Sequence, residues 1–441
     1  FRSKILNFFF ILISGVSAAY SQINLELTYK QSLYMSSNLP NLENSNGLYL
    51  PKGFGSFSTF GMGIENKYFS LSIEPNIILQ KSYDIDVPKK ESLFSVLNDV
   101  PKENYKYPKF NNLGLQIKLR DIGLGFGNWS RWWGPGLHNS LVLSNNAPGF
   151  YHYYLGNINS IKISNYLSYK FSYIVSTSMK NQNNYDYYFS AWFFVLNHEL
   201  FELGISRNIL SGGIELDWNI VDAMTVLLNN KNILLWDTIN EFYLKIFLNK
   251  SNLEVFFDVG IPNRSFAEKN PGAYSNHALA TNLGFIKKRA LGTNNLLYGM
   301  EYTRIIQGIY YNILPTPNWY DNHKYNYSSF NGFRWSAHSG SDSDDFLIFI
   351  GYDDNIISFL YGVNYERHGI TYHFPPEVKF ESRFNISYKI NDYKFSLIYE
   401  NEYFEHYSFV DSYNNVWDET FEKGSIQRTK TLLFSLYYTI F

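Results

Sequence analysis

The fold is decided by residues 379–390, which read Lys-Phe-Glu-Ser-Arg-Phe-Asn-Ile-Ser-Tyr-Lys-Ile. In an extended chain, the apolar residues of this stretch share one face: Phe384, Ile386, Tyr388 and Ile390. The polar residues share the opposite face: Lys379, Glu381, Arg383, Asn385, Ser387 and Lys389. A period of two predicts a β-strand with one apolar and one polar side.

The same alternation recurs along the chain. Further apolar faces are formed by Leu113, Leu115, Ile117 and Leu119; by Tyr169, Phe171, Tyr173 and Val175; by Phe242, Leu244, Ile246 and Leu248; and by Ile357, Phe359, Tyr361, Val363 and Tyr365. A soluble β-sandwich would also use such strands. Two features favour a membrane barrel: the apolar faces begin or end with Tyr or Phe, and about 16 to 18 strand candidates fit the even numbers of bacterial barrels.

Composition supports the same class. Of the 441 residues only 17% are charged and 19% are aromatic, yet the mean hydropathy is -0.24. This combination is typical of strands with one face in lipid and the other in water. A net charge of -2 gives no basic field for nucleic acid, and the absence of cysteine excludes a disulfide scaffold and Cys-ligated zinc.

The first 21 residues resemble a signal peptide. Arg2 and Lys4 precede an apolar run from Ile5 to Val16, and Ser17-Ala18-Ala19 offers a cleavage site of small residues. The run is too short for a membrane-spanning helix, and no later run of about 18 apolar residues occurs. We therefore expect residues 22–441 to form one outer-membrane β-barrel after export, located in the bacterial outer membrane.

Long polar connections are expected at 82–108 and 314–345, and the first includes a candidate short helix, Lys90 to Val100. Long loops of such barrels are extracellular. In the last segment, Thr431 to Phe441, an apolar stripe is formed by Leu432, Phe434, Leu436, Tyr438 and Ile440. A terminal Phe is common in such barrels, although Phe441 lies one residue out of register with that stripe.

The densest motif is residues 127–150, which hold three tryptophans, Trp129, Trp132 and Trp133, and the turn Gly134-Pro135-Gly136. Indole faces stack on sugar rings, Asn amides match neighbouring hydroxyls, and Arg131 offers a planar fork to an acidic sugar. A structural role is the alternative, because Trp is ordinary near a membrane interface and the turn would simply close a strand.

This motif resembles the signature of the Wzi capsule assembly family, through residues 129–136 (Trp-Ser-Arg-Trp-Trp-Gly-Pro-Gly) and 140–147 (Ser-Leu-Val-Leu-Ser-Asn-Asn-Ala). Weaker similarities lie at 202–207 with Gly212-Gly213, at Glu301-Tyr302 and at 338–345. The resemblance implies an 18-stranded barrel with some helix on its periplasmic side, and lectin-like binding of capsular polysaccharide. No substantial helical segment follows the signal peptide, which puts a family plug or bundle in doubt.

Catalytic and metal-binding alternatives are weaker. His138-Asn139-Ser140 holds hydrolase residue types, but neighbours in a strand point to opposite faces. Asp342, Asp344 and Asp345 resemble part of a calcium loop but lack the Gly and distal Glu of an EF-hand, so we expect a solvated acidic loop, with adventitious or structural calcium as the alternative. His368 and His373 are expected to be loop or rim residues. No Gly-rich phosphate loop occurs, so we expect no enzyme, no cofactor and no metal.

The sequence therefore predicts an all-β chain, a transmembrane antiparallel barrel of about 18 strands with a minor helical insert. The predicted function is binding, anchoring or assembly of capsular polysaccharide at the cell surface by a monomer in contact with outer-membrane lipid. The predicted carbohydrate-binding residues are Trp129, Arg131, Trp132, Trp133, Asn145, Asn146, Trp319, Tyr320 and Trp335. The alternatives are a porin or transport barrel and a structural barrel of an envelope secretion machine.

Overall fold

The computed structural model describes residues 23–40, 42–85, 109–215, 218–226, 236–262, 279–291, 294–305, 319–320, 322–354, 356–371, 375–409 and 426–440. Eighteen long strands make the barrel wall: β1 (Asn24–Ser36), β2 (Gly53–Glu65), β3 (Phe69–Ser82), β4 (Phe110–Leu119), β5 (Ile122–Gly127), β6 (His152–Asn157), β8 (Leu167–Ser176), β10 (Asp186–His198), β11 (Phe201–Gly212), β12 (Asp237–Leu248), β13 (Leu253–Pro262), β14 (Ala280–Leu291), β15 (Asn294–Ile305), β18 (Ser343–Asp353), β19 (Ile357–His368), β20 (Glu377–Ile390), β21 (Tyr393–Glu405) and β22 (Gln427–Thr439). The predicted strand number is confirmed.

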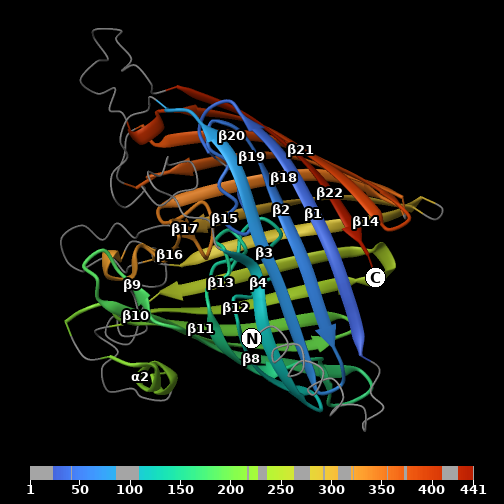
Figure 1. The fold of residues 1–441 in the computed structure, drawn as a ribbon, viewed down its shortest axis with the longest axis vertical. Helices are drawn as coiled ribbons and strands as arrows, with labels where there is room; N and C mark the ends of the chain where they lie inside the picture. The colour runs from blue at the N-terminus through green and yellow to red at the C-terminus, as the bar shows by residue number, and fades with distance from the viewer. Residues whose placement is uncertain are drawn as a thin grey trace, which may run out of the picture.

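The barrel closes because β1 pairs with β22 as well as with β2, and each neighbouring pair in the wall is antiparallel (Figure 1). Two-residue strands accompany the wall, β7 (Ile161–Lys162) and β9 (Met179–Lys180). Connections at the end where β1 begins and β22 ends are mostly short, such as 199–200 and 391–392, and those at the other end are long. By the usual arrangement of such barrels, the long connections are extracellular.

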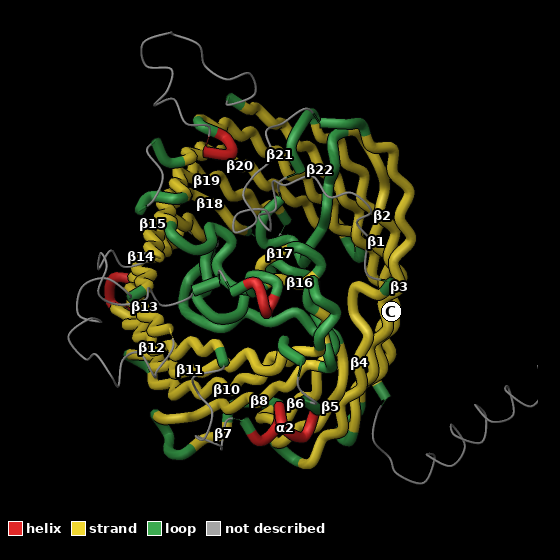
Figure 2. Tube along the Cα trace, turned by 90° about the vertical axis from the view of Figure 1, so that its left-hand side faces the viewer, coloured by secondary structure: helices red, strands yellow, loops and turns green. Residues whose placement is uncertain are grey.

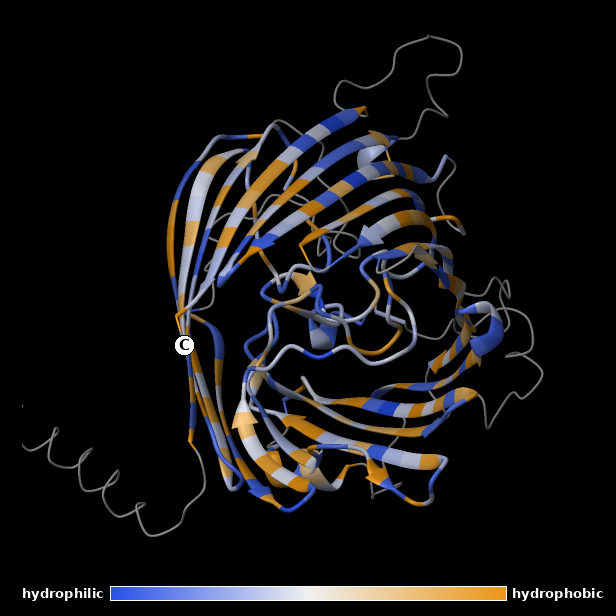
Figure 3. Cartoon of the chain, turned by 90° about the vertical axis from the view of Figure 1, so that its right-hand side faces the viewer, coloured by the Kyte–Doolittle hydropathy of each residue, from blue (hydrophilic) through white to orange (hydrophobic). Residues whose placement is uncertain are grey.

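The outward face is the apolar one, as predicted. Leu115, Ile117 and Leu119 on β4 are exposed, and so are Leu432 and Phe434 on β22. The hydropathy of the strands alternates along their length in Figure 3. Exposed apolar side chains in this pattern meet lipid, whereas those of a soluble sandwich would be buried.

Two aromatic rows mark the membrane interfaces. Near the end with long connections, side chains paired across five neighbouring strands form one row: Tyr302, Phe346, Tyr365, Phe380 and Tyr403. At the end with short turns, four more form the other: Tyr393, Tyr438, Tyr29 and Phe60. These rows are the aromatic girdles that the sequence predicted.

The lumen is filled by three connections that fold inward, which we call the plug: residues 37–52, 128–151 and 319–342, apart from positions 41 and 321. The plug carries the hairpin of β16 (Ser329–Phe330) and β17 (Phe333–Arg334) and the short helix η3 (His323–Tyr325). Figure 2 shows these segments inside the ring of strands. The sequence analysis did not predict this plug.

Helical structure is minor, as predicted. The α-helix among the described residues is α2 (Ile220–Thr225), with capping by Asn219, and the remaining 3-10 turns are η2 (Asn249–Ser251) and η4 (Tyr407–Phe409). Helix α2 lies in the long connection between β11 and β12, at the end of the barrel where long connections occur. The resemblance implied helix at the opposite, periplasmic side. In the described part of the chain, no helix has the length and apolarity needed to span a membrane. The signal peptide, the insert at 90–100, His373 and Phe441 lie outside the described residues.

Candidate functional site: the plug and its two cavities

One side of the plug is apolar and packs on the wall like a protein core. Trp133 is 3% exposed and stacks on Phe193 of β10, with ring centroids 5.1 Å apart and planes inclined by 10°. Its partners in the same cluster include Trp319, Tyr320 and Trp335. Burying large aromatic side chains removes much apolar area from water, so this side holds the plug against β10 and its neighbours.

Backbone and amide hydrogen bonds join the three connections of the plug. The Asn146 side chain accepts from the Asn44 N–H at 3.2 Å and donates to the Arg334 carbonyl at 3.0 Å. The Asn145 carbonyl accepts from the Asn46 N–H at 2.7 Å. Asn146 is 1% exposed, so its amide serves the plug itself. A buried amide satisfied in this way fixes the relative position of the segments that it joins.

Trp129 lies flat on the wall because glycines make room for it. A Cβ at Gly114 or Gly125 would come within 2.3 or 2.8 Å of its ring atoms, so a larger residue at either position would displace the indole. The Arg131 guanidinium lies 5.7 Å from the Trp129 ring and 4.4 Å from the Tyr154 ring. Burial lowers the pKa of Arg131 to about 10, although the neighbouring tyrosine counteracts it.

A polar cavity of about 280 Å³ opens beside this indole, and we call it the Trp129 cavity. Its lining combines the ring with amides and one carboxylate: Asn46, Asn111, Asn112, Asn128 and Glu74. Asn128 is held by the Leu113 N–H at 2.6 Å and the Phe110 carbonyl at 3.1 Å. Asn112 accepts from Ser72 at 3.0 Å through its side-chain oxygen, and it also lines the cavity.

The turn at Gly134-Pro135-Gly136 attaches the plug to β15. Three consecutive N–H groups, of Leu137, His138 and Asn139, donate to the Glu301 carboxylate at 2.6, 3.0 and 2.8 Å. A Cβ at Gly136 would lie 2.3 Å from the Asn139 carbonyl and 2.9 Å from Glu301, so glycine is required for this approach. The turn therefore binds a carboxylate of the wall rather than an external acid.

The opposite side of the plug is charged. The Lys379 ammonium of β20 contacts Glu43 of the plug and lies 2.9 Å from Glu366 of β19. His338 Nε2 is 2.9 Å from Glu43 and 3.2 Å from Asp345 Oδ2. We call Glu43, His138, His338, Asp345, Glu366 and Lys379 the charged cluster.

Two plug residues in the charged cluster have strongly shifted pKa values. Burial acts to lower the pKa of His338, but the facing carboxylates, Glu43 first among them, raise it well above its usual value. Burial acts to raise the pKa of Glu43, but the cationic His338 and Lys379 hold it at about 2. Both groups are therefore charged near neutral pH, and they attach the plug to the wall electrostatically.

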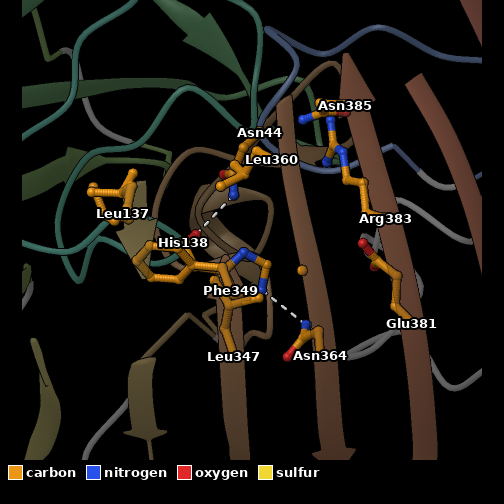
Figure 4. Close-up of a pocket in the computed structure, with 12 residues that line it drawn as sticks. Asn44, Leu137, His138, Leu347, Phe349, Leu360, Asn364, Glu381, Arg383 and Asn385 are labelled. Atoms are coloured by element: carbon orange, nitrogen blue, oxygen red, sulfur yellow. Dashed lines mark hydrogen bonds between the residues drawn. The ribbon is translucent and has the colours of Figure 1, made fainter. Parts of the chain in front are cut away.

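A second cavity, of about 350 Å³, lies next to this cluster, and we call it the His138 cavity. In Figure 4 the His138 ring and the Asn364 amide point toward each other, joined at 2.8 Å, while Glu381, Arg383 and Asn385 line the wall. Leu360 and Asn385 lie nearer to the short-turn ends of β19 and β20 than Glu366 and Lys379 do. The cavity therefore lies on the short-turn side of the plug.

The structure divides the predicted carbohydrate-binding residues into two groups. Five are buried inside the plug: Trp133, Asn146, Trp319, Tyr320 and Trp335. Four are only partly buried: Trp129, Arg131, Trp132 and Asn145. Of the nine, only Trp129 lines the Trp129 cavity. The sequence analysis missed the amides around it, although the alternating Gly123, Gly125 and Gly127 signalled close contact with the inner face of β5.

One expectation about the other motifs was wrong. Asp342, Asp344 and Asp345 do not form a solvated loop: all three are buried, and Asp344 pairs with Arg367. His368 is the last residue of β19, so it lies at the rim as expected, where it is buried between Glu366 and Glu377. The weak hydrolase arrangement has no support, since the Ser140 hydroxyl donates to the backbone carbonyls of Trp133 and Leu143 and not to His138.

Comparison with known proteins agrees with this architecture. The structure of Wzi from Escherichia coli, described in its title as an outer membrane protein involved in group 1 capsule assembly and a carbohydrate binding β-barrel, superposes with a TM-score of 0.62 at 12% identity, covering 93% of this chain and 84% of that one. OpdO of Pseudomonas aeruginosa superposes with a TM-score of 0.50 at 8% identity, covering 95% and 97%.

These identities support the fold alone, and no curated protein sequence matches the chain. The family model described as capsule assembly protein Wzi matches residues 30–241, a segment that includes the Trp129–Asn146 motif and two of the three connections of the plug. In that segment the outer-membrane β-barrel described above is therefore similar to the Wzi capsule assembly family.

Proposed function

We propose that this barrel binds a capsular or related surface polysaccharide at the outer membrane, and that it does so without catalysis. The family match and the carbohydrate binding stated for E. coli Wzi support this function. The apolar outer face surrounds a sheet that closes on itself, which favours a monomer in contact with lipid.

The observation that carries the proposal is the Trp129 cavity. One indole and several amides surround a space of about 280 Å³. Amide groups present a donor and an acceptor together, which suits neighbouring sugar hydroxyls, and the indole offers an apolar surface for the C–H face of a sugar ring. Apolar surface combined with a few placed polar groups is the usual composition of a ligand site.

The predicted binding residues then take two roles. We propose direct contact with the glycan for Trp129 inside the cavity, and for the partly buried Arg131, Trp132 and Asn145 with parts of the polymer that extend beyond the cavity lining. We assign the buried residues to holding the plug in place: Trp133, Asn146, Trp319, Tyr320 and Trp335. The filled lumen favours this function over the porin alternative, because the described plug segments occupy the space that a water-filled channel needs.

Binding to a glycan array by the detergent-purified chain tests the proposal. Asn46 lies at φ +55, in the left-handed region that favours glycine, so Asn46→Gly removes the amide without backbone strain. Losing one hydrogen bond to a sugar corresponds to about 0.5–1.5 kcal/mol, or roughly 2- to 10-fold in affinity.

The matched control is Asn252→Gly, at φ +48 in a short turn remote from the plug. We expect the wild type and the control to bind the same polymer equally and Asn46→Gly to bind it more weakly. The absence of binding by a folded wild type to every polymer, including that of its own cell, would refute the proposed function.

A further inference from the structure

Four metal-ligating side chains meet on the charged side of the plug. Ligand atoms of Glu43, His138, His338 and Glu366 all lie within 4.8 Å of one another. They come from four separate parts of the molecule, because each connection of the plug supplies one and β19 of the wall supplies the last. We propose that these four residues form a binding site for one divalent metal ion of the zinc type.

The donor set matches that chemistry. Two imidazoles and two carboxylates are ligands that Zn²⁺ accepts in tetrahedral geometry with bonds of about 2.0–2.2 Å, which sets neighbouring ligand atoms about 3.3 Å apart. His338 Nε2 already lies 2.9 Å from Glu43 Oε2 and 3.7 Å from Glu366 Oε1. The ligand atoms lie up to 4.8 Å apart, so ligation requires the widest of these separations to shrink by up to about 1.5 Å.

An independent observation concerns His338, which is 5% exposed as a residue. Within the described structure its Nδ1 has no hydrogen-bond partner, and its Nε2 faces carboxylate oxygens without an aligned hydrogen bond. Glu43 Oε2 is also buried without an aligned partner. Buried polar atoms normally have aligned hydrogen bonds, so these atoms keep ligating capacity that a cation bound beside the His338–Glu43 pair would use.

The local charge balance also favours a cation. Five buried carboxylates surround this point: Glu43, Asp345, Glu366, Glu381 and Glu402. Lys379 alone contacts four of them. A metal ion would supply the positive charge that protonated His338 otherwise provides, because buried carboxylates need such compensation.

Neighbouring groups are placed to orient the ligands. Lys379 and the Asn364 amide hold Glu366 Oε1 at 2.9 and 2.7 Å. The Asn364 amide also lies 2.8 Å from His138 Nε2, and ligation through that nitrogen would replace this hydrogen bond. Such outer contacts tune affinity in known metal sites. One ion would then join all three connections of the plug to the wall, a role independent of glycan binding.

Metal content of the full chain in detergent tests the site. The protein is loaded with Zn²⁺ or Co²⁺, freed of excess ion by gel filtration, and measured by mass spectrometry; Co²⁺ also reports its coordination by visible absorption. Variants His338→Gln and His138→Gln are compared with His152→Gln, a buried histidine bonded to Arg131 on the apolar side. Folding of each variant is checked by heat-modified gel mobility.

We expect about one ion per chain and a tetrahedral Co²⁺ spectrum for the wild type and for His152→Gln, with affinity reduced about 100-fold or more in the two cluster variants. We also expect a chelator to lower the melting temperature of the loaded wild type but not of His338→Gln. A folded wild type that retains no Zn²⁺ or Co²⁺, or retains it equally after His338→Gln, would overturn the proposal.

Discussion

The two sides of the plug are attached to the wall by different kinds of interaction. On one side Trp133 stacks on Phe193 within a continuous aromatic core. On the other side Glu43 and His338 reach carboxylates and the ammonium of Lys379 on β18 to β20. The first attachment is non-directional and depends on buried area, whereas the second depends on charge and geometry.

This difference explains why part of the tryptophan motif is buried. Its most conspicuous residues supply the apolar attachment, so Trp133 is hidden from any ligand in this arrangement. The polar groups that we propose as sugar contacts lie beside Trp129, at the edge of that core. In that proposal, a motif that is rich in aromatic residues positions the binding surface more than it forms it.

The largest effect is expected from the apolar side. Trp133→Ala removes a fully buried aromatic ring and should destabilise the plug by about 3–5 kcal/mol, while Trp132→Ala, at a partly exposed position, should cost far less. Limited proteolysis of the plug and thermal unfolding in detergent measure the difference. On cells, the Trp132/Trp133 double variant should keep a folded barrel but retain less capsule. If Trp132→Ala and Trp133→Ala destabilise the plug equally, the difference between the buried and the partly exposed position is contradicted.

An intermediate effect is expected from the carboxylate that holds the Gly-Pro-Gly turn. Glu301→Gln keeps the shape but removes the charge that accepts three backbone N–H groups, and should destabilise the plug by about 1.5–3 kcal/mol. Glu254→Gln is the control, because its pair with the exposed Lys288 contributes no more than about 1 kcal/mol. If Glu301→Gln and Glu254→Gln have the same melting temperature, Glu301 does not anchor the plug.

The smallest effect is expected from a single amide, and it shows which side of the plug binds sugar. Asn112→Ala in the Trp129 cavity should weaken glycan binding by roughly 2- to 10-fold, whereas Asn385→Ala in the His138 cavity should leave it unchanged. Equilibrium binding of defined oligosaccharides measures both. The reverse result would move the glycan site to the charged side.

The wall was predictable because its pattern is local. The alternation at 380–390 corresponds to β20, and its polar face points inward with Lys379 and Glu381 buried. Lipid outside and polar groups inside impose a period of two on each strand, so a short window of sequence suffices. The aromatic girdles were predictable for the same reason.

The plug was not predictable because its contacts are not local. Glu43 and Lys379 are separated by 336 positions, and no periodicity relates them. The acidic residues at 342–345 looked solvated because their burial depends on the plug and wall around them. The same holds for the metal-binding geometry, since its four ligands come from separate connections and a strand.

Single-channel conductance of the purified chain in planar bilayers tests the central claim most directly, namely that a plug attached on two sides closes this barrel. We expect the wild type to show no stable channels, because the described plug segments pack across the lumen, and Trp133→Ala to show intermittent openings as one attachment weakens. Stable, ohmic conductance by the folded wild type would contradict the account and favour a porin.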